Sequence, residues 1–334
     1  MKEFKINNND AGQRLDRFVA KAVPLLPGST AQKYIRIKRI KVCGKGARRD
    51  YLLREGDVVQ MYVNDEFFMH ECALSDICHA NASADAGKHP AAPHGLDIVY
   101  EDENILLVNK QAGMLCHSDG GCGFSSVIAQ VRSYLHLKNQ WDPRMENSFA
   151  PALCNRIDRN TSGIVIAAKN AMSLRIINEK IRLREIDKYY LAAVHGTPLP
   201  ASGMLDGYLY KDAEKNQALI THVARPGSKR VQTEYTTLVT SGNLTLLECR
   251  LITGRTHQIR AQLYDIGHPL LGDIKYGGWK SNMPYGERRQ ALCAYKLSFS
   301  FVTDAQALSY LGGRSFQISD VPFVSKYFQK LIDI

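Results

Sequence analysis

This chain has 334 residues, 45% of them apolar, which is enough material for two or three hydrophobic cores. It contains no run of about 18 or more apolar residues, and its start, MKEFKINNND, lacks the apolar segment of a signal peptide. These features argue against a membrane-spanning or secreted protein, so we expect a cytoplasmic one. The net charge of +10 at pH 7 favours a polyanionic partner.

The chain has eight cysteines. In a cytoplasmic protein these are expected to be reduced thiols. Cys72, Cys78 and His79 lie near one another in the sequence, but no spacing matches a zinc template. We therefore expect no metal site.

Positive charge is concentrated at the N-terminal end, where residues 1–64 contain 14 Lys and Arg against 6 Asp and Glu. Apolar residues at helical spacing predict a helix in GQRLDRFVAKAV, and a second helix begins at the cap-like Ser29-Thr30. Glycine turns between short apolar runs then predict strands as far as residue 63.

The cations of this segment surround a small predicted core, so we expect a nucleic-acid-binding face rather than a merely solvated surface. No basic amphipathic helix with large apolar residues favours lipid instead. The expected binding residues are Arg14, Arg17, Lys33, Arg36, Lys38, Arg39 and Lys41.

Three motifs of the segment, RLDRF, IKVCGK and LREGDVV, resemble those of the alpha-L RNA-binding motif, a small domain named after a ribosomal protein. The resemblance covers roughly residues 12–63 and implies a small α/β RNA-binding domain. That family usually has an asparagine where this chain has Cys43.

Residues 65–96 lose periodicity and become rich in Ala, His, Gly and Pro, which predicts a linker. From residue 97 the pattern changes to LDIVYEDENILLVNK, two short strands around an acidic turn. Further helices are expected at 124–135, 170–183 and 321–332, and strands at 163–168, 187–195, 232–239, 244–252 and 293–301. This order predicts an α+β domain over 97–334, with a mixed, largely antiparallel sheet flanked by helices.

Several common catalytic motifs do not occur in the sequence. It has no phosphate-binding GxxxxGK[ST] loop, no GxGxxG after a strand, no HExxH and no GxSxG. These absences leave NTP hydrolysis and dinucleotide chemistry unsupported, so we expect no nucleotide cofactor.

The segment NRIDRNTSGIVIAAK places one acid, Asp158, between Arg156 and Arg159, just before an apolar strand. In an extended chain Arg156 and Asp158 would share a face, and nearby arginines should lower the pKa of the aspartate. An ionised acid at neutral pH suits a nucleophile or a base. A salt bridge that closes a turn is the purely structural alternative.

Two later stretches favour a functional site. EIDKYYLAAVHG places Lys188 and Tyr190 on a strand, and LITGRTHQIR places Arg255, His257 and Arg260 near the start of a helix. Backbone N–H groups at a helix start already favour anions, so these residues predict a phosphate-facing pocket.

These three stretches resemble, in the same order, the R-L-D-x-x-T-S-G, K-x-Y-x-A and G-R-T-H-Q-I-R motifs of the RluA-type pseudouridine synthases. The resemblance covers about residues 97–330 and implies the pseudouridine synthase fold. With the N-terminal module, it extends to the subgroup that acts on large-subunit ribosomal RNA. Its motifs imply that Asp158 is the essential aspartate.

The resemblance also implies roles for neighbouring residues. Arg156 matches the arginine that fills the gap left by a flipped nucleotide, Tyr190 the tyrosine that packs on the target base, and Arg260 the partner of the aspartate. Asn155, where a histidine is usual, and Gln111, where a proline is usual, depart from the family pattern.

The implied reaction needs no cofactor, and two routes remain open. The aspartate either attacks the sugar at C1′ or removes the 2′ proton to form a glycal. An inactive RNA-binding factor and a nuclease are the alternatives, but the first would lack the aspartate and the second would need a cluster of carboxylates for metal ions. We expect RNA as the partner, no membrane association, and a monomer.

Overall fold

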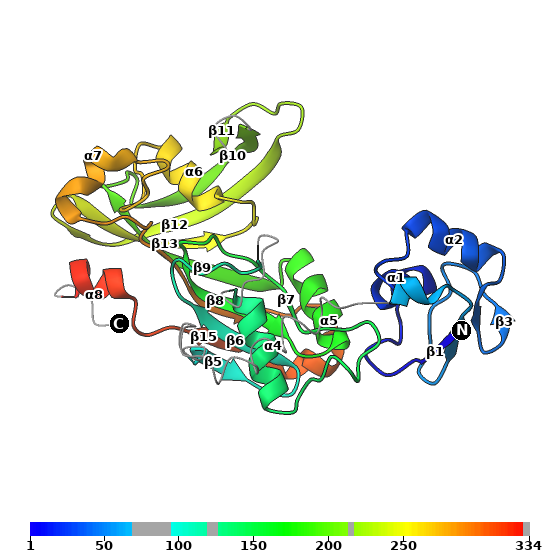
Figure 1. Cartoon of the computed structure of the whole chain (residues 1–334). Helices are drawn as coiled ribbons and strands as arrows, with labels where there is room; N and C mark the ends of the chain where they lie inside the picture. Colours follow the sequence, from blue (N-terminus) through cyan, green and yellow to red (C-terminus); the bar gives the residue numbers. More distant parts are fainter. Residues whose placement is uncertain (69–94, 119–125, 213–216, 330–334) are drawn as a thin grey trace, which may run out of the picture.

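The computed structural model describes residues 1–68, 95–118, 126–212 and 217–329. Figure 1 shows a small N-terminal part beside a larger part that contains the long sheet. Among the residues described, no helix is long and apolar enough to cross a membrane.

The N-terminal part is a four-stranded antiparallel sheet, in the order β1-β4-β2-β3, with two helices. Its core includes Phe18 and Val19 of the first helix, Ile35 of the second, and Val59 of the sheet. Its elements are β1 (Lys2–Lys5), α1 (Leu15–Ala22), α2 (Gly28–Arg36), β2 (Ile40–Val42), β3 (Lys45–Gly46), β4 (Val58–Met61) and the 3-10 helix η1 (Asp65–Phe68).

Two details differ from the sequence prediction. Ser29 and Thr30 lie inside the first turn of α2, whose N-cap is Pro27, so they do not cap it. Strand β1 was not predicted, because a four-residue strand with one buried side chain has little periodic signal.

Cys43 adopts φ +49°, in the left-handed region. Asparagine tolerates that conformation better than most residues, which gives a physical reason for its usual presence in the alpha-L motif.

The larger part is built on an 11-stranded sheet in the order β11-β10-β12-β13-β9-β14-β8-β6-β5, with β15 paired to β14 and β7 to β8. All pairs are antiparallel except β14 with β8, so the predicted mixed, largely antiparallel sheet is confirmed. The strands are β5 (Ile98–Glu101), β6 (Ile105–Lys110), β7 (Ala152–Leu153), β8 (Ser162–Ala168), β9 (Ile186–His195), β10 (Ser202–Asp212), β11 (Gln217–Thr221), β12 (Lys229–Ser241), β13 (Leu244–Leu251), β14 (Leu292–Phe299) and β15 (Ser315–Gln317).

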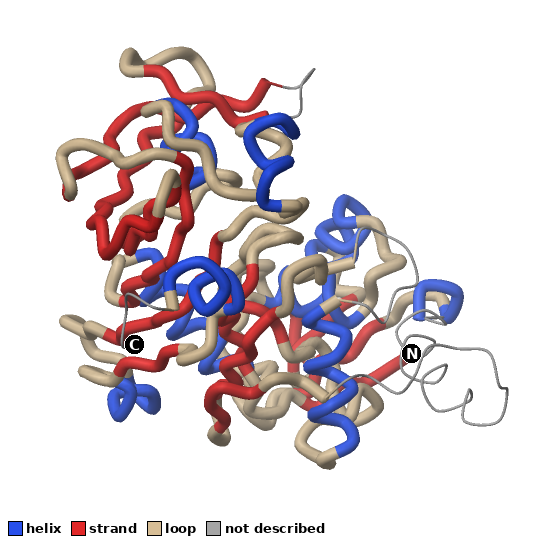
Figure 2. The backbone as a smooth tube through the Cα atoms, turned by 90° about the vertical axis from the view of Figure 1, so that its left-hand side faces the viewer, coloured by secondary structure: helices blue, strands red, loops and turns tan. Residues whose placement is uncertain are grey.

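Helices cover both faces of this sheet, as Figure 2 shows. On β6, Leu106 packs with α4 and Leu107 with α5, and successive strand residues point to opposite faces. Helix α6 packs over Tyr190 and Ala192 of β9, and α8 packs over Leu191 on the other face. The helices are α4 (Val127–Leu137), α5 (Ala171–Arg182), α6 (Gln258–Asp265), α7 (Gly278–Asn282) and α8 (Pro322–Phe328), with 3-10 helices η3 (Met283–Tyr285) and η4 (Gln306–Leu311).

The strongly periodic elements lie where the sequence predicts them. Strands β10 and β11 were not predicted, because the glycines of SGMLDGYLYKD interrupt the alternation of β10. The domain boundaries at 64 and 97 stay predictions, since most of the proposed linker, with Cys72, Cys78 and His79, lies outside the described residues. Phe67 and Phe68 of its first residues pack against the N-terminal core.

Polar contacts join the two parts of the chain. Asp10 is fully buried and accepts hydrogen bonds from Asn147 Nδ2 at 2.7 Å and Ser148 Oγ at 2.6 Å. Asn9 donates to Glu146 at 2.7 Å and accepts from the backbone N–H of Ala171, the first residue of α5. We use the name latch for the side chains of Asn9, Asp10, Glu146, Asn147 and Ser148.

Candidate active site

Asp158 lies in the irregular segment between β7 and β8. Its carbonyl oxygen accepts from the Thr161 N–H at 3.1 Å, which closes a turn into β8. Ile157 is buried in the core beneath α6. The buried neighbour and the closed turn fix the backbone from which the carboxylate projects.

Gly163, in the Thr-Ser-Gly motif, is required by a close approach of two strands. It adopts φ +120°, and a Cβ atom there would lie 2.4 Å from the backbone oxygen of Ala294. A residue with a side chain would therefore separate β8 from β14, the strand between β8 and β9.

Arg260 holds Asp158 and a second carboxylate together. Its Nη1 donates to Asp158 Oδ2 at 2.9 Å, while Nε and Nη2 form a two-point ion pair with Asp273 at 2.7 and 3.0 Å. The side chains of Arg260 and Asp273 are 8% and 1% exposed, whereas that of Asp158 is 23% exposed. Burial alone would lower the pKa of Arg260, but the two carboxylates outweigh it and raise the pKa.

The two flanking arginines do not take the position expected from the sequence. Arg156 and Arg159 are exposed, and within the described part of the chain neither forms an ion pair with Asp158. Arg159 Nε instead donates to the carbonyl of Gly113 at 3.1 Å. The segment is not a regular strand, so the rule that alternate residues share a face does not apply to it.

His257 is the N-cap of α6, in the left-handed conformation at φ +58°. Its Nε2 lies 3.8 Å from Asp158 Oδ2, and its Nδ1 is within 3.1 Å of the Tyr276 hydroxyl. Burial lowers the pKa of His257, more than the nearby Asp158 raises it, so the ring is neutral at pH 7.

The phosphate-facing pocket at this turn stays a prediction. Arg255 is exposed, His257 is neutral, and Arg260 is occupied by carboxylates. The turn itself is held by the buried Gln258, whose Oε1 accepts from the Arg255 N–H at 3.1 Å and whose Nε2 donates to the Gln232 carbonyl at 3.0 Å.

Tyr190 lies on β9 in the core beneath α6 and is 6% exposed. Burial, followed by the charge of Asp158, raises the pKa of its phenol, so the hydroxyl is neutral at pH 7. Among the described residues, its hydroxyl has no hydrogen-bond partner. Lys188, two residues earlier on the same face of β9, is half-buried.

Lys110 binds backbone carbonyls of the Asp158 segment and of the loop after β6. Its side chain is 1% exposed, and Nζ donates to the carbonyls of Gln111, Met114 and Arg159 at 3.1, 2.9 and 2.9 Å. Burial lowers the pKa of Lys110 to about 8. Because these carbonyls meet at one amine, the loop after β6 is held against the Asp158 segment.

The two departures from the family pattern lie outside the carboxylate cluster. Asn155 Oδ1 accepts from the backbone N–H of Ile166 on β8 at 2.8 Å, so this side chain anchors the Asp158 segment. Gln111 is exposed, and its carbonyl is one of those bound by Lys110.

The cations expected to bind nucleic acid in the N-terminal part lie on the surface. Arg14 is paired with Asp16, and Lys41 is half-buried with its amine 5.4 Å from the centre of the Tyr62 ring. The remaining ones are exposed: Arg17, Lys33, Arg36, Lys38 and Arg39.

Sequence reasoning missed Asp273 and Tyr276. Asp273 ends the stretch IGHPLLGD, and Tyr276 lies with its ring centre 5.2 Å from the Arg260 guanidinium. An acid that follows a glycine turn is the only local signal, and it does not say which cation the acid binds.

The cluster presents one carboxylate oxygen to a substrate. Both contacts of the Asp158 side chain use Oδ2, so Oδ1 has no partner among the described residues. Such an oxygen can attack an electrophilic carbon or remove a proton. In the described part of the chain, no three His, Cys, Asp or Glu side chains are grouped as metal ligands.

The chain is similar to known RNA-modifying enzymes. A model of the RNA pseudouridylate synthase family matches residues 104–265. An uncharacterized RNA pseudouridine synthase of Mycoplasma capricolum is 32% identical over 317 residues, which cover 94% of this chain and 96% of the relative. Ribosomal large subunit pseudouridine synthase C of Haemophilus ducreyi is 31% identical over 274 residues, covering 82% and 79%.

Solved structures agree with the fold. The human protein RNA Pseudouridylate Synthase Domain Containing 4 superposes with a TM-score of 0.55 at 20% identity, covering 78% of this chain and 97% of that chain. This likeness confirms the predicted fold class.

Proposed function

This chain belongs to the RluA-type RNA pseudouridine synthases, and from that premise we propose that Asp158 isomerises uridine to pseudouridine in large-subunit ribosomal RNA. The observation that carries the proposal is the geometry of Asp158, which is held at Oδ2 by a buried arginine and open at Oδ1.

The reaction breaks the bond between N1 of uracil and C1′ of ribose, turns the base, and joins C5 to C1′. N1 gains a proton and C5 loses one, so no atom or electron is exchanged with another molecule. Asp158 Oδ1 either attacks C1′ directly or removes the 2′ proton to form a glycal. Arg260 serves both routes, because its Nη1 donates to Oδ2 and so orients the carboxylate.

The detached uracil must turn without leaving the site. The ring of Tyr190 is neutral and buried, and it lies close enough to Asp158 for that charge to raise the pKa of the phenol. Such a ring is suited to stack against the base. The pKa of its phenol is raised, so it places no phenolate beside the aspartate.

Access requires the target nucleotide to leave its stack, at a cost of a few kcal/mol. Arg156 is exposed two residues before Asp158, so its guanidinium can occupy the gap and contact phosphate. This role, like those of Arg159 and Arg255, is part of the proposal.

The choice of ribosomal RNA is supported by the name of the Haemophilus ducreyi relative and by the exposed cations around α2. We assign these cations to backbone phosphates, where they supply affinity without reading sequence. A monomeric, cytoplasmic enzyme is part of the same proposal.

The substitution Asp158→Asn tests the proposal. The amide keeps the size of the carboxylate but cannot act as a base or nucleophile, so we expect pseudouridine formation to be abolished while RNA binding is retained. The measurement is chemical mapping of pseudouridine in large-subunit ribosomal RNA incubated with the purified variant or parent.

Asp206→Asn is the matched control, since Asp206 is an exposed acid on β10 that is paired with Arg230. It should keep parental activity. Substantial pseudouridine formation by the Asp158 variant would disprove the role of this carboxylate, and an absence of sites in ribosomal RNA treated with the parent would disprove the substrate.

A further inference from the structure

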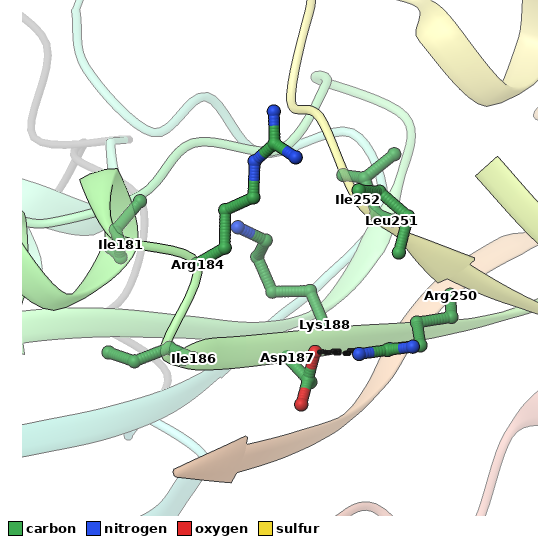
Figure 3. Close-up of a pocket in the computed structure, with 8 residues that line it drawn as sticks. All are labelled: Ile181, Arg184, Ile186, Asp187, Lys188, Arg250, Leu251 and Ile252. Carbon is green, nitrogen blue, oxygen red and sulfur yellow. Dashed lines mark hydrogen bonds and ion pairs between the residues drawn. The ribbon is translucent and has the colours of Figure 1, made fainter. Parts of the chain in front are cut away.

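A small cavity of about 80 Å³ lies between the end of α5 and the adjoining ends of β9 and β13. Its apolar walls come from Ile181, Ile186, Leu251 and Ile252 (Figure 3). Its volume suits a group of a few heavy atoms, not a nucleobase.

The four charged residues at the cavity divide into two pairs. Asp187 and Arg250 bind each other at 2.9 Å, on one side of β9. Arg184 and Lys188 extend on the other side, where Figure 3 shows their nitrogen atoms facing the same space. Among the described residues, neither forms an ion pair or a side-chain hydrogen bond.

The surroundings of these two cations favour an anion. Burial lowers the pKa of Lys188, and the apolar walls strengthen any charge interaction inside the cavity. Asp187 partly offsets the effect of burial on the pKa of Lys188, but its carboxylate is paired with Arg250. A bound anion would give the two cations a partner of their own.

Arg184 occupies an unfavourable backbone position. It follows the end of α5 at φ +61°, in the left-handed conformation that favours glycine. Strained residues cluster at functional sites, so a strained residue whose side chain lines a cavity indicates a function there.

The cavity is connected to the active site along β9 and along the segment that follows β13. Lys188 and Tyr190 are two residues apart on one face of β9, roughly 7 Å along the strand. Ile252, on the opposite wall, leads directly into the turn that contains His257. The cavity therefore lies on the face of β9 that carries Tyr190.

We propose that Arg184 and Lys188 bind a backbone phosphate of the RNA next to the target uridine. The guanidinium can donate two parallel N–H bonds to phosphate oxygens, and the ammonium adds a point charge. This inference rests on the proposed function for the identity of the RNA, whereas the anion site itself rests on the cavity.

The test is the salt dependence of RNA binding. One lost phosphate contact should reduce the slope of log K against log salt by about 0.7 for single-stranded RNA. We expect this reduction for the double variant Arg184→Gln/Lys188→Gln with an unmodified large-subunit ribosomal RNA transcript. Arg182→Gln is the control, because Arg182 is exposed near the same helix end and is already paired with Glu179.

A second variant distinguishes loss of the anion site from misfolding. Arg184→Gly removes the guanidinium and relieves the left-handed conformation, so it should raise the melting temperature and still weaken RNA binding. Equal salt slopes for parent, control and double variant would overturn the inference.

Inorganic phosphate separates the two sources of the anion. If it competes with RNA in the parent and not in the double variant, the cavity is a phosphate site that RNA uses. If it binds the cavity while the RNA slopes stay equal, the site serves a free anion and the inference fails. A parent that binds RNA with the expected slope but forms no pseudouridine would instead refute the proposed function.

Discussion

One guanidinium between two carboxylates organises the chemistry of this molecule at the scale of the residue. Arg260 neutralises Asp273 in a two-point pair through Nε and Nη2, and its Nη1 donates to Asp158. Asp273 is 1% exposed, so it is more fully enclosed than the aspartate that meets the substrate. Its role is to position Arg260 rather than to touch RNA.

Asp273→Asn should therefore impair the reaction without affecting binding. Loss of a charge-assisted contact is worth about 1.5–3 kcal/mol, which corresponds to roughly a 10- to 100-fold fall in kcat. The measurement is single-turnover pseudouridine formation together with the dissociation constant for RNA. A fall in RNA affinity with unchanged kcat would show that Asp273 does not act through Arg260.

At the scale of elements, one acid joins three segments of the sheet domain. Glu101 is the last residue of β5. Its carboxylate accepts hydrogen bonds from the Tyr134 hydroxyl of α4 at 2.6 Å and from the amine of Lys138, the C-cap of α4, at 3.1 Å. It also accepts one from the amine of Lys169, just after β8, at 3.0 Å. Burial raises its pKa, but these three donors outweigh burial and lower the pKa to about 2.

This contact should make stability depend on pH. The folded pKa lies below the unfolded value of about 4.3, so between these values the unfolded chain binds more protons and acidification favours unfolding. Glu101→Gln should lower the free energy of unfolding by about 1–3 kcal/mol above about pH 5, and by less near pH 2.

Urea unfolding at the two pH values measures this difference. Glu103→Gln is the control, since Glu103 is exposed in the same turn. If the Glu101 variant and the parent lose stability equally on acidification, the contact does not contribute in this way.

At the scale of the whole molecule, the latch connects the basic N-terminal part to the domain that contains Asp158. The contact is polar and centred on a fully buried acid, Asp10. A buried acid without partners is costly, so the two parts are favoured in one relative arrangement.

The double variant Asn147→Ala/Ser148→Ala should loosen this arrangement without altering the N-terminal part itself. We expect a broader distribution of distances between spin labels on α2 and α5, and a several-fold higher KM for ribosomal RNA. Asp50→Ala, at an exposed acid that is paired with Arg48 and is not part of the latch, should change neither. A narrow, unchanged distance distribution would show that the latch does not set the arrangement.

Local patterns in the chain were enough to identify the family, the aspartate that we propose as catalytic, and the strongly periodic elements. The periodic elements could be predicted because an apolar repeat shows which face of a helix or strand is buried. The motif around Asp158 and the spacing of Lys188 and Tyr190 could be read directly from the chain.

The surroundings of the Asp158–Arg260 pair became known only from the folded arrangement. The resemblance implied Arg260 as the partner of Asp158, whereas the local spacing also favoured the flanking Arg156, which forms no ion pair with Asp158 among the described residues. The sequence did not show that Asp273 holds Arg260. Folding also brings Arg184 and Lys188 to one cavity. An ion pair forms only where folding brings two distant segments of the chain close to each other. A charged residue has no periodic pattern in the sequence that shows where its side chain points or which residue it binds.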